Sequence, residues 1–358
     1  MNDYPLESKH KYKALVDFLR RGIADGTFSA GEKLDTEAGY SEKFKMSRQT
    51  VRHALSVLEK DGLITRRHGS GSYVRQQGQF RETTMTIGVI VSYMSEYIFP
   101  SIIRGIEEIT SAAGYSFKLS ATGNRMDAEK RILTSYLENP VDGLIVEGTK
   151  TAMPNPNIAL YRRLEEIGVP VVFINGYYPT FGGAYVVTAD REGGKTGAEY
   201  LISKGRSRFG GIFKADDLQG HERFAGFVEG LMDAGLEMRD DEAVWFTTES
   251  QAGLFSDGSA TILKTLKDCD AVICYNDQIA INLINMLTKS GVKVPEDISV
   301  LSFDDSIYSD ICGIKISSLA HPKEALGREA TLKLLNMIDG KREVPLVMPF
   351  ELREKEST

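Results

Sequence analysis

The chain has 358 residues, of which 42% are hydrophobic, 26% charged and 9% aromatic, and its formal net charge is −7. This is the composition of a folded, soluble protein, and the length excludes a single ordinary domain, so we expect two or three. Residues 1–80 hold 14 Lys and Arg against 10 Asp and Glu, a net of +4, and the remainder holds 29 against 40, a net of −11. This asymmetry excludes a uniformly cationic chain and favours a small nucleic-acid-binding module joined to an acidic body.

The first predicted elements are two helices. Residues 9–26 place apolar side chains on one helical stripe that stops at Gly26. Asp35 or Thr36 then caps a short helix that reaches about Phe44.

A third helix follows, and it is the segment around which the front of the chain is organised. Ser47 is a typical N-cap residue and Gly62 a typical C-terminal stop. The apolar stripe between them is Val51, Ala54, Leu55 and Leu58. Two short strands, 63–66 and 72–75, are joined by a tight polar turn. Helix, helix, helix and hairpin is the order of a winged helix-turn-helix, whose third helix enters the DNA major groove. The alternative is a small helical hairpin with a solvated basic face.

In the DNA-binding interpretation, polar side chains at the start of the third helix and in the hairpin contact the duplex. Arg48 and Arg52 can bind guanine or phosphate, and Gln49 can pair with adenine. Ser47 and Thr50 suit backbone contacts. Further contacts to phosphate and the minor groove are expected from Lys45, Arg66, Arg67 and the wing residues Gly69, Ser70 and Gly71.

These residues carry a family resemblance that covers nearly the whole front domain. The matching strings are Gly31-Glu32-Lys33-Leu34, Thr36-Glu37, Ser47-Arg48-Gln49-Thr50-Val51-Arg52, Gly62-Leu63-Ile64 and Gly69-Ser70-Gly71-Ser72-Tyr73-Val74. They resemble the N-terminal domain of the gluconate-repressor (GntR) family. Ala30 and Asp35-Thr36 depart from the P-G-x-K-L-P-S-E pattern usual there, a change that does not touch the groove-reading helix.

Residues 76–85 are polar and lack apolar periodicity, so we expect a linker. After it, strands and helices alternate, which predicts parallel sheets in doubly wound domains, and the length suggests two sheets. The expected strands are 86–91, 116–122, 143–147, 170–175, 208–213, 244–247, 271–275 and 298–303. The expected helices are 99–113, 126–139, 158–167, 193–204, 220–234, 258–266 and 277–290.

Ligands of open α/β sheets bind beyond the carboxyl ends of the strands. The residues there combine aromatic rings, which stack on a sugar ring, with acids, amides and cations, which bind hydroxyls in pairs. The candidates are Tyr93, Tyr97, Phe99, Glu147, Lys150, Asn175, Gln219, His221, Arg223, Tyr275, Asn276, Asp304 and His321. Singly they are weak, since Asn276 could cap a helix, Asp304 could form a turn and His321 could be a loop residue. Their joint placement favours a ligand site.

The second part of the chain resembles the effector domain of the lactose/galactose-repressor (LacI/GalR) family, which shares its fold with periplasmic sugar-binding proteins. The carrying motifs include Asp142-Gly143-Leu144-Ile145-Val146, Tyr275-Asn276-Asp277-Gln278-Ile279-Ala280, Val294-Pro295-Glu296-Asp297-Ile298-Ser299-Val300 and Ser302-Phe303-Asp304-Asp305. A GntR-type reader joined to such an effector domain resembles the arabinose-repressor (AraR) family of Gram-positive bacteria.

This resemblance implies that Asn175, His221, Asn276, Asp304 and His321 contact sugar, and that the effector is L-arabinose. The wider family often has an acid where Asn175 stands and an Arg where His221 stands, and Arg223 could supply the missing guanidinium. These departures leave open another monosaccharide as the effector.

The alternative function is a sugar-modifying α/β enzyme, but catalytic motifs are lacking. Gly193-Gly194-Lys195-Thr196 would need a glycine at position 189 to be a phosphate-binding loop, and Ala189 is there. Adjacent acids such as Asp216 and Asp217 point to opposite faces of a strand. No GxSxG, HExxH or Cys/His metal spacing occurs. A plain sugar-binding module would leave residues 1–75 unexplained and would need a signal peptide.

The remaining features indicate the compartment. Cys269, Cys274 and Cys312 form no CxxC pair, which predicts buried free thiols in a reducing cytosol. The N-terminal residues lack the apolar stretch of a signal peptide, and no apolar run reaches about 18 residues, the length of a transmembrane helix. We therefore expect a cytoplasmic protein without a membrane partner, metal or cofactor.

The sequence thus predicts an α/β protein with a winged helix-turn-helix at 1–75, a linker at 76–85 and a two-subdomain, periplasmic-binding-protein-like effector and dimerisation domain at 86–358. Its expected function is that of a sugar-responsive transcriptional repressor. We expect it to bind double-stranded operator DNA as a homodimer and to be released by the monosaccharide.

Overall fold

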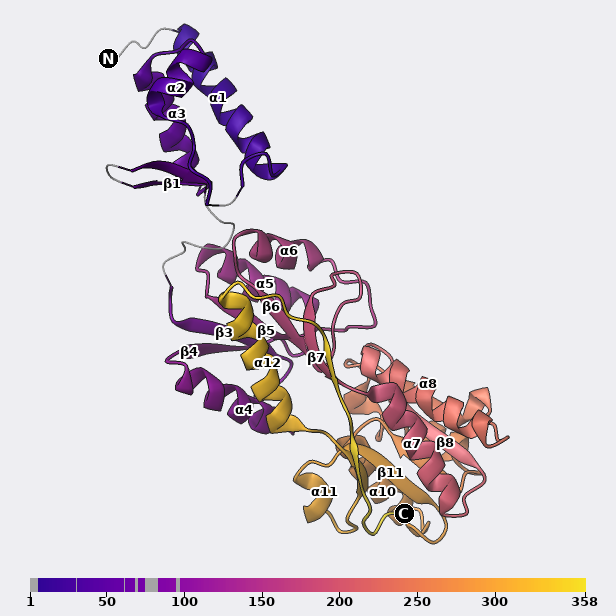
Figure 1. Cartoon of the computed structure of the whole chain (residues 1–358). Helices are drawn as coiled ribbons and strands as arrows, with labels where there is room; N and C mark the ends of the chain where they lie inside the picture. The colour runs from indigo at the N-terminus through magenta and orange to yellow at the C-terminus, as the bar shows by residue number, and fades with distance from the viewer. Residues whose placement is uncertain (1–5, 30, 61, 68–69, 75–82, 95–96) are drawn as a thin grey trace. The chain divides into compact units, whose positions relative to one another are not determined.

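The computed structural model describes residues 6–29, 31–60, 62–67, 70–74, 83–94 and 97–358. They form two compact units, an N-terminal unit built mainly from residues before Thr84 and a C-terminal unit that begins at Thr84 (Figure 1). Among the described residues, no helix combines the length and the apolar character that crossing a membrane requires.

The N-terminal unit consists of three helices and a two-stranded antiparallel sheet. Its elements are α1 (Leu6–Ala24), α2 (Glu37–Lys43), α3 (Arg48–Lys60), β1 (Ile64–Arg67) and β2 (Gly71–Val74). The apolar stripe of α3 forms the centre of its core, because Val51, Ala54, Leu55 and Leu58 are all buried against α1. This order of elements confirms the predicted winged helix-turn-helix.

Local chemistry explains where these helices begin and end. The Thr36 hydroxyl accepts a hydrogen bond from the Gly39 amide at 3.0 Å and so caps α2. The Ser47 hydroxyl accepts one from the Thr50 amide at 3.1 Å at the start of α3. After α3 the chain reverses at Gly62, whose φ of +74° lies in the left-handed region that favours glycine.

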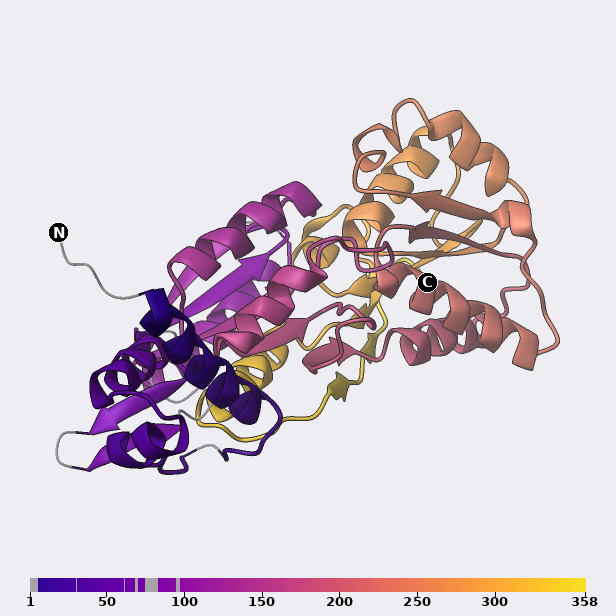
Figure 2. The same cartoon turned by 90° about the horizontal axis from the view of Figure 1, so that it is seen from above.

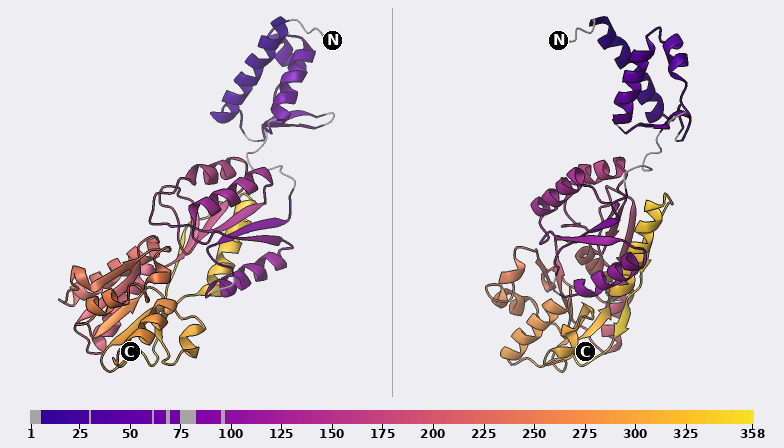
Figure 3. Two further views of the ribbon diagram at one scale, coloured as in Figure 1. Left: turned by 180° about the vertical axis from the view of Figure 1, so that it is seen from behind. Right: turned by 90° about the vertical axis from the view of Figure 1, so that its left-hand side faces the viewer.

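The C-terminal unit has two lobes, each built on a six-stranded sheet. The strands of the first lobe lie in the order β13-β7-β6-β5-β3-β4 and those of the second in the order β14-β12-β11-β10-β8-β9. All neighbouring strands are parallel except β14, which runs antiparallel to β12. The predicted doubly wound architecture with two sheets is therefore confirmed. Figures 2 and 3 show the two lobes from further directions.

The elements have the following bounds. The first lobe contains β3 (Thr86–Val91), α4 (Phe99–Ala112), β4 (Ser116–Ala121), α5 (Met126–Glu138), β5 (Gly143–Glu147), α6 (Ile158–Glu166), β6 (Val171–Ile174), β7 (Ala184–Thr188), α12 (Lys323–Ile338) and β13 (Leu346–Met348). The second lobe contains α7 (Asp190–Ser203), β8 (Phe209–Lys214), α8 (Leu218–Asp233), β9 (Ala243–Phe246), α9 (Ser259–Thr265), β10 (Ala271–Cys274), α10 (Asp277–Lys289), β11 (Ser299–Asp304), α11 (Tyr308–Ile311), β12 (Ser317–Ala320) and β14 (Glu351–Arg353), with short 3₁₀ turns at Asp240–Glu242 and Gln251–Gly253.

The chain passes between the lobes three times. It crosses from β7 into α7, returns from β12 into α12, and crosses again from β13 into β14, the yellow segment of Figure 1. The Ala189 amide donates to the Met348 carbonyl at 2.8 Å, so two of the crossings are bonded to each other. Three connections between two lobes are the arrangement of a hinge, and the space between the lobes is the natural place for a ligand.

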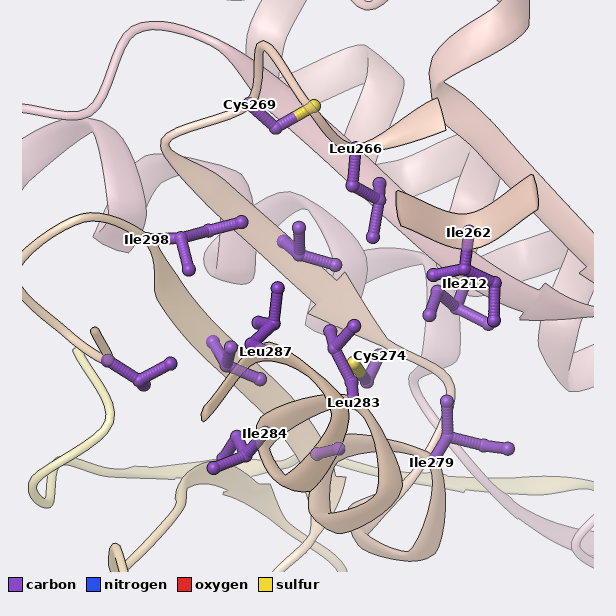
Figure 4. Close-up of a cluster of buried hydrophobic side chains, with 14 of the residues drawn as sticks. Ile212, Ile262, Leu266, Cys269, Cys274, Ile279, Leu283, Ile284, Leu287 and Ile298 are labelled. Atoms are coloured by element: carbon purple, nitrogen blue, oxygen red, sulfur yellow. The ribbon is translucent and has the colours of Figure 1, made fainter. Parts of the chain in front are cut away.

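Each lobe is held together by apolar side chains between its sheet and its helices. Figure 4 shows one such cluster in the second lobe, where the buried Leu283, Ile284 and Leu287 of α10 lie beside residues of the central strands such as Ile212 and Cys274. The strands are apolar on both faces because helices cover both sides of a parallel sheet. This explains why their sequences are nearly continuous apolar runs.

The glycine-rich string that resembles a phosphate-binding loop has a packing role. Gly194 lies within α7, where a Cβ atom would overlap the Arg223 carbonyl of α8. The two helices can approach closely only because this position lacks a side chain. The string is therefore a helix contact.

Two smaller expectations need correction. Cys269 and Cys274 are buried free thiols as predicted, but Cys312 is only half-buried because it directly follows the short surface helix α11. The predicted linker also runs too far, since the amides of Thr84 and Met85 donate to the carboxylate of Asp142 at 2.9 and 3.0 Å and thereby belong to the first lobe. Residues 75–82 lie outside the described part of the chain.

Candidate functional site

Most of the residues predicted to read DNA lie on the first turns of α3 and in the segment just before it. Lys45, Ser47, Arg48, Gln49 and Arg52 are exposed, and Thr50 is half-buried. They lie opposite the buried stripe, at the N-terminal end of the helix. This is the end at which recognition helices contact base edges.

Two of the predicted arginines are occupied within the protein. Arg52 donates to the carboxylate of Glu37 on α2, with a shortest distance of 2.9 Å. Arg66 donates to the Arg52 carbonyl at 2.7 Å and lies 3.5 Å from Glu59. Arg66 therefore fastens the hairpin to α3, a role that the sequence did not indicate.

The wing is described only in part. Ser70 and Gly71 are exposed at its turn, and the Ser70 hydroxyl is bonded to the Tyr73 hydroxyl at 2.6 Å. Gly71 has a φ of +120°, a backbone angle that residues other than glycine rarely adopt. Gly69 and the side chain of Arg67 lie outside the described residues.

In the C-terminal unit, a cavity of about 320 Å³ lies between the two lobes. It is formed at the carboxyl ends of both sheets, where ligands of this architecture bind. Its lining includes Tyr93, Tyr97, Phe99, Glu147, Asn175, Gln219, Arg223, Tyr275, Asn276 and Asp304, all of them predicted from the sequence. The structure thus brings together side chains that are more than 200 positions apart in the chain.

The first-lobe wall is built on a chain of hydrogen bonds. Glu147 accepts from the Ser92 amide at 2.6 Å and from the Asn175 side-chain amide at 3.0 Å. Because a carboxylate can only accept, the NH₂ group of Asn175 must face Glu147. The side-chain oxygen of Asn175 therefore faces His321 and accepts from its Nε2 at 3.1 Å. Burial raises the pKa of Glu147. The amide of Asn175 is therefore held in one orientation, and both ends of it are in use.

The second-lobe wall centres on a buried guanidinium. Arg223 donates to Asp190 at 2.7 Å and to the Tyr275 carbonyl at 2.6 Å, and its Nη2 lies 3.6 Å from Asp304 Oδ1. This oxygen of Asp304 is buried and, within the part of the chain that the structure describes, has no hydrogen-bond partner. A buried acceptor in that state is costly unless a bound molecule donates to it.

Tyr97 crosses from the first lobe to the second at the cavity. Its hydroxyl donates to Asp304 at 2.7 Å and accepts from the Asp277 amide at 3.0 Å. Its own φ is +66°, in the left-handed region where a tyrosine is uncommon. The ring therefore stands where the two lobes meet, and its position depends on the distance between them.

Three predicted ligand residues do not line the cavity. Lys150 forms ion pairs with Glu249 and, at 3.8 Å, with Asp216, because these carboxylates attract its ammonium group away from the cavity. His221 is exposed, donates to the Ala215 carbonyl at 2.8 Å and packs against Trp245. His321 lies buried at the hinge behind Asn175 and orients that side chain.

Asn276 combines the two roles that the sequence left open. Its side chain accepts from the Ile279 amide at 3.1 Å and caps α10, and the residue also lines the cavity.

Several lining residues were not predicted. Lys214 and Asp217 form an ion pair of 2.6 Å on the second-lobe wall, and Thr248 and Gln251 come from the loop after β9. The first two could have been found, because Lys214 is the last residue of β8 and Asp217 precedes α8, as expected for a sheet-end site. Ser92, Ile98, Ala252 and Gln278 complete the lining.

The charges in the cavity set its chemistry. The carboxylates of Glu147 and Asp304 face it, whereas Lys214 is paired with Asp217 and Arg223 with Asp190. Acceptors of this kind bind the hydroxyl groups of a neutral polyol, and the rings of Tyr93, Phe99 and Tyr275 offer surfaces for its C–H groups. No group of acids, histidines or cysteines suited to hold a metal occurs within the described ranges.

Comparison with known proteins divides the chain in the same way. The description of bacterial regulatory proteins of the gntR family matches residues 11–74, and that of a periplasmic binding protein-like domain matches residues 198–358. The chain is 35% identical to the arabinose metabolism transcriptional repressor of Geobacillus stearothermophilus, over 92% of this chain and 91% of that protein. It is 33% identical to the protein so named in Halalkalibacterium halodurans, over 93% and 90%.

Solved structures share the fold. The complex of the transcriptional regulator CelR with cellobiose superposes with a TM-score of 0.69 at 26% identity, covering 87% of this chain and 90% of that one. A periplasmic binding protein/LacI transcriptional regulator from Alkaliphilus metalliredigens QYMF, complexed with D-xylulofuranose, gives a TM-score of 0.67 at 22% identity, covering 77% and 99%.

Proposed function

The chain belongs to the family of arabinose metabolism transcriptional repressors, and from this premise we propose that L-arabinose is the sugar that releases it from operator DNA. Like its relatives and structural neighbours, the protein is a sugar-responsive regulator of transcription, and it is not an enzyme.

The observation that carries the proposal is the cavity between the lobes. Its walls offer carboxylate acceptors from both sheets, among them the oxygen of Asp304 that accepts no hydrogen bond from the described residues. A pentopyranose presents hydroxyl groups on several sides of its ring and would donate to Glu147 on one wall and to Asp304 on the other. A ligand that bonds to both walls holds the lobes together, so it favours the closed arrangement.

The same set of charges selects against anionic sugars. Glu147 and Asp304 would repel a carboxylate or phosphate, and Lys214 and Arg223 would have to leave Asp217 and Asp190 to bind one. D-Galacturonic acid is a useful probe, since it carries a carboxylate where D-galactose carries a CH₂OH group and L-arabinose a hydrogen. We expect it to bind more weakly than D-galactose.

For the N-terminal unit, the proposal assigns base reading to Arg48 and Gln49 and backbone contacts to Lys45, Ser47 and Thr50. The assignment is supported because Lys45, Ser47, Arg48 and Gln49 are exposed at the start of α3 and Thr50 is half-buried there. Arg52 can join them if it leaves Glu37, whereas Arg66 serves the hairpin.

We infer that the protein acts in the cytoplasm as a homodimer on a pseudo-palindromic operator, because two-fold symmetric readers commonly bind such sites. Sedimentation of the purified chain at micromolar concentration tests the oligomeric state. A monomer, both free and on operator DNA, would contradict this part of the proposal.

The central test is calorimetric titration of the full chain with L-arabinose, with D-xylose, D-ribose, D-galactose and D-galacturonic acid alongside. We expect saturable binding that is tightest for L-arabinose, and release of operator DNA over the same concentration range. If another sugar binds and L-arabinose does not, the regulator assignment stands and the effector is different. If no sugar binds, the role of the cavity is wrong.

A further inference from the structure

A second set of contacts joins the two lobes beside the cavity, through a residue that does not line it. Asn124 lies in the turn between β4 and α5 of the first lobe, is only 1% exposed and has a φ of +54°. Its side-chain amide donates to the Thr248 hydroxyl at 2.7 Å and to Asp217 at 3.3 Å, both in the second lobe. Its side-chain oxygen accepts from the Lys150 amide at 2.9 Å.

The loop that begins with Lys150 makes further bonds across the gap. The Lys150 ammonium pairs with Glu249 and lies 3.8 Å from Asp216. The Thr151 hydroxyl accepts from the Leu218 amide at 2.9 Å, and the Ala152 amide donates to the Asp216 carbonyl at 3.3 Å. Every one of these bonds would break if the lobes moved apart.

The first-lobe side of this contact is firmly held. The Thr149 amide donates to the Tyr178 hydroxyl at 2.6 Å, and that hydroxyl is bonded to the buried Glu129 at 2.7 Å. Glu129 also accepts from Tyr161 and Asn157 at 2.7 Å each. A loop anchored in this way moves with the first lobe. It cannot follow the second lobe, so its bonds to that lobe are lost when the lobes separate.

We propose that Asn124 and Lys150 form a clasp that stabilises the closed form without touching the sugar, and that Asn124 is a positioning residue for Asp217 and Thr248 on the cavity wall. The inference rests on the proposed function, since it assumes that sugar selects the closed form and operator DNA the open one. Both residues have left-handed backbone conformations, with φ values of +54° and +47°, which asparagine adopts readily but which are uncommon for a lysine.

The clasp sets the equilibrium between the open and closed forms of the sugar-free protein. A ligand shifts a two-state equilibrium only by its difference in affinity for the two states, and the starting position is fixed by the protein itself. Contacts that favour closure in the absence of sugar lower the sugar concentration needed for release and weaken operator binding. Loss of the clasp therefore changes the two affinities in opposite directions.

The test compares Asn124→Ala and Lys150→Met with the wild-type full chain. Asp233→Asn is the matched control, since its ion pair with Lys195, at 2.6 Å, lies within the second lobe. We expect the Kd for L-arabinose to rise at least fivefold in both clasp variants, and the Kd for operator in sugar-free buffer to fall. The control should change neither. A weaker sugar affinity with unchanged sugar-free operator affinity would overturn the clasp, because damage confined to the cavity gives that result.

Hydrogen exchange tests the clasp without any ligand. The amides of Leu218 and Ala152 donate across the gap, so in sugar-free protein they should exchange at least tenfold faster in Lys150→Met than in wild type or Asp233→Asn. Equal protection in all three proteins would overturn the proposal. If the wild type bound neither L-arabinose nor operator, the proposed function would fail while this measurement still decided whether the clasp exists.

Discussion

At the residue scale, the end of β11 shows how the backbone prepares the cavity. Asp304 and Asp305 have φ values of +95° and +46°, an unusual pair of left-handed residues that are not glycine. The reversal turns the Asp304 carboxylate toward Tyr97 and Arg223, while Asp305 pairs with Lys355 at 2.6 Å. Neighbouring acids that both have a positive φ thus have different surroundings, which makes them a matched pair for mutation.

Asp304→Asn should weaken sugar binding by about ten- to a hundredfold, equivalent to roughly 1.4–2.8 kcal/mol. The substitution keeps the shape and the tolerance of left-handed backbone but removes a charged acceptor. Calorimetric titration with L-arabinose measures the change. Asp305→Asn, which does not alter the cavity lining, should stay within about twofold of wild type. Equal losses in the two variants would mean that the whole turn, and not the Asp304 carboxylate, matters.

His321 should make stability depend on pH. Burial lowers its pKa to about 4 in the folded protein, although Asp304 opposes the shift. Between its ordinary pKa of about 6.5 and about 4, the unfolded chain binds a proton that the folded chain does not. The stabilisation is therefore present above this range and is lost as the pH falls through it.

When the pH falls from 7 to 5, we expect protonation linked to His321 to lower the free energy of unfolding of the wild type by about 2 kcal/mol. A His321→Gln variant should not show this loss. Urea unfolding of both proteins at the two pH values measures the difference. Burial raises the pKa of Asp277 to about 6, which has the opposite effect, but that residue is common to both proteins and cancels. Parallel pH profiles would contradict the prediction.

At the scale of elements, the short helix α2 depends on its cap. Thr36→Ala removes the acceptor for the Gly39 amide and should cost about 1 kcal/mol of local stability. Amide exchange in α2 should then accelerate about fivefold in that variant. Thr36→Ser retains the hydroxyl and is the control. If both variants exchange like wild type, tertiary packing of Tyr40 alone holds the helix.

The other element prediction concerns α3. Arg48→Ala should cost about 1–3 kcal/mol of operator affinity and relax specificity at one base pair, if Arg48 reads a base. Lys45→Ala should instead weaken binding to all sequences alike and reduce the salt dependence by about one counterion. Fluorescence anisotropy with the operator, single-base variants and a salt series separates the two. Unchanged affinity in Arg48→Ala would refute the assignment of α3.

At the scale of the whole molecule, sugar and operator must be linked in both directions. If saturating L-arabinose raises the operator Kd by some factor, saturating operator raises the L-arabinose Kd by the same factor. Titration of sugar into free protein and into the protein–operator complex measures both. Identical sugar affinities in the two titrations would mean that the sugar does not regulate DNA binding, even if it occupies the cavity.

The sequence by itself determined the kinds of element and most of their positions. Strands 86–91 and 143–147 were predicted to the residue, because continuous apolar runs between turn residues have few other structures. It missed β7, β12, α12, β13 and β14, the elements around the crossings between lobes. Short strands such as β13 and β14 are only partly buried and too short to show an alternating apolar pattern. They become strands because neighbouring strands bond to them.

Only the tertiary structure decided which polar residues face the cavity. Local sequence shows that a polar residue follows a strand, but the direction of its side chain depends on the charges that surround it in the fold. Lys150 turns to Glu249 and Asp216, and His321 turns to Asn175, partners more than 60 positions away in each case. Long-range ion pairs and hydrogen bonds of this kind leave no periodic mark on a sequence, which is why the fold could be predicted and the clasp could not.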